Sequence, residues 1–94
     1  MEKQHHEFNL IKGKFDPESA WSILFALVNS KINFHGMESF GITIRSNGDT
    51  SFHEGRIKEL VQTNRDIKKV IDLAADHKKI LWMEGNIKIT LVDE

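Results

Sequence analysis

The sequence predicts an α+β protein, a small two-layer domain with elements in the order strand, helix, helix, strand, strand. Two features of the last third predict this class. An amphipathic pattern over residues 52–79 is typical of a long helix. It runs into two apolar segments, 80–83 and 87–91, and the intervening Glu84-Gly85-Asn86 has the composition of a turn between strands. We expect a two-helix hairpin to pack on the small sheet.

Length and composition set the limits of what this chain can be. Its 94 residues give room for one domain, residues 1–94. The net charge of -1 creates no overall field toward nucleic acid or anionic lipid. Cysteine is absent, which removes disulfides and thiolate-bound zinc. The polar residues 1–6 are expected to be disordered, and no apolar stretch approaches the ~18–20 residues of a membrane span. We therefore expect a cytoplasmic protein without membrane contact.

The first strand is expected at residues 7–15, and the first helix begins at Pro17. Asp16 is a typical N-cap residue, and proline suits the first helical position because an N–H there has no intrahelical partner. The apolar residues that follow cover more than half of the helix circumference: Ala20, Trp21, Ile23, Leu24, Phe25, Leu27 and Val28. Such a helix needs apolar neighbours on more than one side. We expect the N-terminal strand to pair with the C-terminal one and close the domain.

Residues 30–50 have the least regular pattern. Residues 42–45 alternate as in a short strand, and Asn47-Gly48 is a type I′ turn signal, so an extra hairpin between the helices is one interpretation. The other interpretation is a loop. A loop of this length in a compact domain is usually functional or mobile. The pattern leaves both interpretations open.

The second helix is expected to begin at a capping box, in which Ser51 caps the helix and Glu54 reaches back to it. Its apolar stripe contains Ile57, Leu60, Val61, Ile67, Val70, Ile71 and Ala74. Asn64 lies in the middle of this stripe. The opposite face carries the basic run Arg65, Lys68 and Lys69, but acidic residues are interspersed among the bases, so we expect a solvated face.

Histidine is the residue type with which this chain would bind a metal or transfer a proton, and it has five. None has a known metal-ligand spacing. If the central segment folds back on the second helix, His35 and Glu38 converge with His53 and Glu54, and such a set suits zinc or iron. Solvated loop histidines are the ordinary alternative. No hydrolase, phosphate-loop or dinucleotide motif is present, so we expect no enzyme activity, no catalytic residue and no cofactor.

Trp82 and Met83 end the first of the two C-terminal strands. Both residue types are enriched at the centres of protein interfaces, so Trp82 is a candidate anchor for a partner, and packing into the core is the alternative. A small sheet also leaves an unpaired edge, which favours dimerisation by strand addition unless Lys12 or Lys88 guards it. The candidate binding residues are Asn33, Phe34, His35, Glu38, His53 and Trp82.

Several short segments resemble a group of short uncharacterised bacterial proteins. They are Phe15-Asp16-Pro17-Glu18, Ile23-Leu24, the run from Asn29 to His35, Arg56-Ile57 and Ile87-Lys88-Ile89. The most specific of them is Lys31-Ile32-Asn33-Phe34-His35. The resemblance spans nearly the whole chain and implies no activity, cofactor, partner or functional residue.

The sequence favours a small, non-catalytic, cytoplasmic binding or accessory module that self-associates as a homodimer or binds another protein. One alternative is weak nucleic-acid binding through the basic side chains of the second helix, although the net charge makes nucleic acid an unfavourable partner. The residues for this alternative are Arg56, Lys58, Arg65, Lys68 and Lys69. The other alternative is a small metal-binding protein that uses His35 and His53.

Overall fold

The computed structural model describes residues 4–93 of the chain. These residues form β1 (His5–Phe15), α1 (Pro17–Ser46), α2 (Ser51–Asp76) and β2 (Leu81–Thr90). The two strands pair in an antiparallel two-stranded sheet, here called the ribbon. The α+β class, the order strand, helix, helix, strand, and the pairing of the first strand with the last are thus confirmed. His5 and His6 belong to β1 and are not disordered, whereas residues 1–3 of the expected disordered end lie outside the described part.

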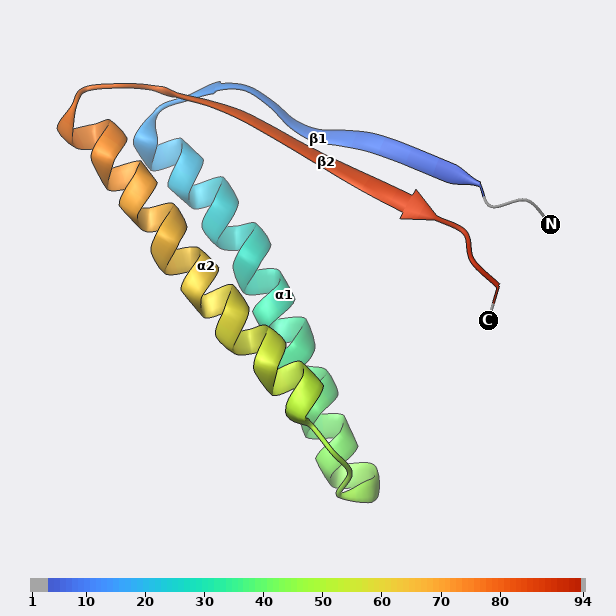
Figure 1. Ribbon diagram of the computed structural model, residues 1–94. Helices are drawn as coiled ribbons and strands as arrows, with labels where there is room; N and C mark the ends of the chain where they lie inside the picture. The colour runs from blue at the N-terminus through green and yellow to red at the C-terminus, as the bar shows by residue number, and fades with distance from the viewer. Residues whose placement is uncertain (1–3, 94) are drawn as a thin grey trace.

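The molecule is an open V with two arms (Figure 1). The antiparallel helices form one arm and the ribbon forms the other, and they meet at the corner, where Phe15 leads into α1 and the chain after Asp76 turns into β2. The overall extents are 51 × 36 × 14 Å. The smallest extent is close to the ~10–12 Å diameter of one helix, so the molecule is about one layer thick. The expected packing of helices on sheet is therefore confined to the corner.

Helix α1 begins as the sequence predicts and ends much later. The side chain of Asp16 accepts a hydrogen bond from the backbone N–H of Ser19 at 3.2 Å. The helix ends at Asn47, which adopts the left-handed conformation (φ 51°) and donates its N–H to the carbonyl of Thr43. Asparagine tolerates this conformation, so Asn47-Gly48 terminates a helix instead of joining two strands. The expected hairpin or loop between the helices was wrong.

The two antiparallel helices are offset along their length. The last turns of α1 extend past the start of α2, and residues 47–50 run back to it (Figure 1). The capping box predicted at Ser51 does not form. Thr50 is the N-cap residue, its hydroxyl donates to Glu54, and the Ser51 N–H is bonded by the carboxylate of Asp49. Because the end of α1 has no α2 beside it, its side chains face solvent.

Strand β2 is continuous through Glu84-Gly85-Asn86, so the turn and the second C-terminal strand that we expected there were wrong. In the register of the ribbon, Gly85 lies opposite Ile11. A Cβ at position 85 would lie 3.4 Å from the Ile11 side chain, so this glycine provides room for a close neighbour. A bulge at Leu10 interrupts the register at the same place.

The bulge keeps one face of the ribbon mainly apolar, from the corner to Ile87 and Ile89. Side chains alternate between faces, and directly opposed residues share a face. Leu10 is the extra residue of the bulge and has no partner opposite it. Phe8 therefore lies on the same face as Ile11, although the two are three positions apart. This apolar face contains Phe8, Ile11, Gly13, Phe15, Leu81, Met83, Gly85, Ile87 and Ile89, and His6 lies on it opposite Ile89 at the outer end. The opposite, polar face contains Glu7, Asn9, Lys12, Lys14, Trp82, Glu84, Asn86, Lys88 and Thr90.

The buried core lies at the corner. Ala20 of α1, Ile71 of α2 and Met83 of β2 form one buried cluster. Half-buried apolar side chains surround it: Ile11, Phe15, Trp21, Ile23, Leu24, Ile67 and Leu81. Leu60 is also buried, farther along the helical arm. Within residues 4–93, no helix combines the length and the apolar character needed to cross a membrane.

We expect Ile71→Ala to lower the free energy of unfolding by ~2–5 kcal/mol, because it opens a cavity in the one cluster that joins the three elements. Val70→Ala is the matched control, since Val70 is exposed and its truncation should cost less than ~1 kcal/mol. Urea unfolding at one protein concentration measures both. Equal losses for the two variants would contradict the position of the core.

Candidate binding site

Two histidines from different helices meet in the seam of the helical arm. The Nδ1 atoms of His35, in α1, and His53, in the first turn of α2, are 2.8 Å apart. His35 is 8% exposed, which makes it one of the buried residues of the chain. Two imidazoles at this distance share one proton, so that one Nδ1 donates and the other accepts. The ring that accepts this hydrogen bond must be neutral at Nδ1.

Two phenylalanines extend this contact into a continuous cluster. Phe34 lies edge-on to His35 with a centroid separation of 5.2 Å, and Phe52 lies edge-on to His53 at 5.2 Å. Both phenylalanines are exposed over more than half of their surface. We call Phe34, His35, Phe52 and His53 the His–Phe cluster. The cluster is buried at His35, between the two helices, and its two phenylalanines are exposed to solvent.

The surroundings hold the pKa of His35 below the ordinary value of 6.5. Burial is the largest cause, because a low-dielectric environment disfavours the charged imidazolium. The positive charges of His53, Arg56 and Lys31 act in the same direction, and the carboxylate of Glu38 opposes them. The lowered pKa favours the neutral form of the His35 ring between the two helices.

The structure brings five of the six candidate residues to this part of the helical arm. Asn33 lines a shallow groove of about 550 Å³ on the side of α1, together with Ile32, Gly36, Met37, Phe40 and Ile57. Glu38 is half-buried near His35. Glu54, the other carboxylate considered as a ligand, accepts from Thr50. Among residues 4–93, no three His, Asp or Glu side chains are grouped closely enough to hold a metal ion. The site as it stands offers two nitrogen ligands and an aromatic surface.

Trp82, the sixth candidate residue, lies apart from the others at the corner. It is 57% exposed and lies on the polar face of the ribbon opposite Lys14, so it is not a core residue. Its indole N–H donates to the carboxylate of Glu84 at 3.2 Å. The apolar part of the ring remains in solvent. This is the arrangement expected of an interface anchor.

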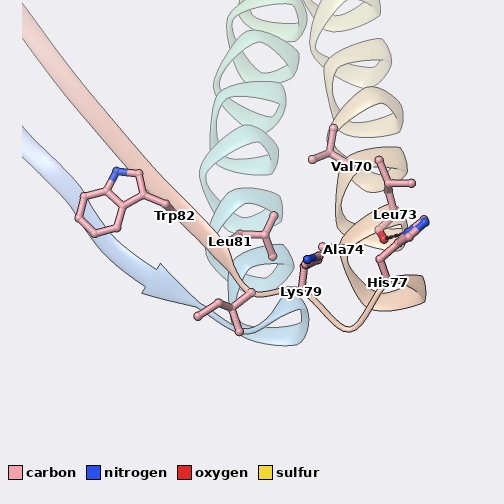
Figure 2. Close-up of a pocket in the computed structure, with 8 residues that line it drawn as sticks. Val70, Leu73, Ala74, His77, Lys79, Leu81 and Trp82 are labelled. Carbon is pink, nitrogen blue, oxygen red and sulfur yellow. Dashed lines mark hydrogen bonds between the residues drawn. The ribbon is translucent and has the colours of Figure 1, made fainter.

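A surface groove of about 460 Å³ leads from Trp82 to the end of α2 (Figure 2). Its apolar lining comes from Val70, Leu73, Ala74, Ile80 and Leu81, and His77 and Lys79 also line it. The sequence pattern did not predict this groove, because it assigned Val70 to the buried stripe. An apolar groove with a few polar groups at its edge is typical of a ligand or peptide site.

The basic side chains of α2 are partly neutralised within the helix. Arg56 pairs with Glu59, and Lys68 pairs with Asp72. The ammonium of Lys68 also lies 5.7 Å from the centroid of the Trp21 ring. These contacts favour the solvated face that the interspersed charges predict.

One polar group in the helical seam has no partner. The Oδ1 atom of Asn64 is buried and makes no hydrogen bond to the described residues. An unpaired buried carbonyl costs roughly 1–3 kcal/mol. The sequence showed this residue in the apolar stripe of the second helix, and the structure confirms that it faces the seam.

We expect the free energy of unfolding to decrease as the pH falls below about 6.5. The pKa of His35 is lower in the folded state than in the unfolded state, so the unfolded chain binds a proton that the fold does not. The contribution is complete above the unfolded pKa and is lost as the pH falls through the lower folded value. Urea unfolding at pH 7.5 and pH 5.5 measures it, and His35→Phe should make the two free energies more alike. The exposed His6→Gln is the control and should leave the difference in place.

Comparisons with known proteins found no relative of this chain. No family model, no curated protein and no solved structure matches the chain. The resemblance to short bacterial proteins therefore stays a prediction, and the residues themselves carry the functional argument.

Proposed function

We propose that this protein is a small, non-catalytic binding module that works in a self-associated form. The observation that carries the proposal is its surface. The chain exposes 7526 Å², whereas a compact monomer of 10.9 kDa exposes about 5,600 Å². The radius of gyration is 17.1 Å, against about 12 Å for a compact domain of this length. A cytoplasmic location is part of the same proposal.

The character of α1 supports this proposal. Its large apolar residues lie on every side of the helix, which is typical of a helix that is covered all round. In α1, which the structure describes throughout, only Ala20 and His35 are buried. The exposed apolar residues are Phe25, Leu27, Phe34, Met37, Phe40 and Ile44. Monomeric soluble proteins rarely expose continuous apolar surface on this scale, and larger patches mark interaction sites.

The groove beside Trp82 is the surface best suited to a different partner. Trp82 is the one apolar side chain on the polar face of the ribbon, and its groove is lined by apolar residues of α2 and β2. We propose that an apolar side chain of a partner protein enters this groove, with Trp82 stacked over it.

Metal binding through His35 and His53 is the second candidate function, favoured by the 2.8 Å approach of their Nδ1 atoms. A tetrahedral zinc site needs four ligands, so two further ligands would have to come from water or a partner. Nucleic-acid binding ranks below it, because Arg56 and Lys68 already pair with acidic neighbours and the net charge is -1.

We expect the sedimentation-equilibrium mass to exceed 10.9 kDa and to rise with protein concentration, because the uncovered apolar surface favours association. The control is Val70→Ser with Leu73→Ser, which changes the Trp82 groove and should leave this mass unchanged. A strictly monomeric wild-type chain at millimolar concentration would contradict the proposed function.

A further inference from the structure

We propose that a second copy of this chain completes the open V, with the outer half of the ribbon of each copy lying along α1 of the other. This inference rests on the proposed self-association and names the surfaces that carry it. The partner is thus a protein of the same sequence, and each copy contributes an apolar ribbon face and an apolar helix face.

The ribbon provides the first surface. Its apolar face is continuous from Phe15 and Leu81 at the corner to Ile89 near the far end. The corner half packs on the helices around Met83, whereas the outer half extends away from them (Figure 1). Phe8 is 53% exposed in this outer half, and Ile87 and Ile89 beside it are also exposed. The apolar face of the ribbon is therefore part of the core at the corner and exposed to solvent in its outer half.

Helix α1 provides the second surface, on the side that faces the gap of the V. Leu27 and Phe34 are seven residues apart and lie on the same side of the helix, and both are exposed. Leu27 also lines a groove of about 300 Å³ between α1 and the ribbon, together with Val28, Leu10, Ile11 and Ile87. This groove between the two arms is apolar, so it suits apolar side chains of a second copy.

The surface of α1 is long enough to hold the outer half of a ribbon. Residues 5–10 of β1 extend over about 20 Å at ~3.3 Å per residue. The part of α1 from Leu27 to Ser46 extends over about 30 Å at 1.5 Å per residue. The outer half of one ribbon can thus lie along the uncovered part of a partner's α1 without leaving the helix.

The excess exposed area is sufficient for such an interface. The chain exposes about 1,900 Å² more than a compact monomer of its mass. A standard interface buries about 800 Å² on each partner, and obligate homodimers bury more and are more apolar. A reciprocal contact of this kind covers the same two patches on both copies, so it closes as a two-fold dimer and leaves no copy of either patch free to recruit a third chain.

The test uses the absence of cysteine in the natural chain. Phe8→Cys and Phe34→Cys are made as separate variants, one of them with a mass tag, mixed under dissociating conditions, reassociated, and treated with a short bis-maleimide crosslinker. We expect a mixed crosslinked species that joins residue 8 of one copy to residue 34 of the other. Asn9→Cys, which lies on the polar face beside Phe8, replaces Phe8→Cys in the control and should give little of this species.

The outcomes separate this inference from the proposed function. A dimer by sedimentation that gives no more 8-to-34 product than the Asn9→Cys control would overturn the docking mode and leave self-association standing. A dimer in which Phe8→Cys links only to itself would point to pairing of ribbon with ribbon and would also overturn it. A monomer in both experiments would remove the inference and the proposed function together.

A charge on the apolar face gives an independent measurement. Phe8→Lys should raise the dimer dissociation constant about tenfold or more, because it places an ammonium in an apolar contact. Asn9→Lys adds the same charge one residue away on the polar face and should change the constant much less. Circular dichroism checks that both variants remain folded. Equal effects of the two variants would overturn the assignment of the apolar face to the interface.

Discussion

The contact of Ala20, Ile71 and Met83 at the corner is the interaction on which the rest of the structure depends. These residues come from α1, α2 and β2, and their cluster is where both helices and the ribbon pack together. Ala20 is fully buried, and its methyl group lets the neighbouring elements approach α1 closely. The relation between the two arms is set by this small cluster. Away from this cluster the two arms diverge and do not pack against each other. The excess of exposed apolar surface follows from that geometry.

The parts of this fold that were predictable from the sequence are those whose signals have one meaning. Asp16-Pro17 starts a helix, and the alternating segments at the two ends of the chain pair with each other. Asn47-Gly48 and Gly85 have two meanings, because the same residues suit a turn, a helix end or a close approach between strands, and only the tertiary neighbours decide. The sequence offered the meeting of His35 with His53 only as one alternative, on the condition that the central segment folds back. The meeting results from the continuation of α1 as a helix and not from a loop that folds back.

The polar groups in the helical seam have a role that apolar residues do not fill. Because α1 is apolar on every side, many rotations and offsets of α2 against it would bury similar areas. The hydrogen bond between His35 and His53 exists in one offset, whereas the unpaired buried carbonyl of Asn64 is a cost of that same offset. In coiled coils a single buried polar residue specifies register at a cost in stability. The stagger that leaves the last turns of α1 uncovered is consistent with such a selection.

The two faces of the ribbon separate two kinds of contact. On the polar face, opposite charges lie across from each other at Lys12 and Glu84 and at Glu7 and Lys88, which favours a solvated surface and discourages apolar association there. Trp82 interrupts that face and is oriented by Glu84. If a second copy covers the outer half of the apolar face, Trp82 and its groove at the corner stay accessible. Assembly and recognition of another protein would then use different residues of the same two strands, so that one contact does not exclude the other.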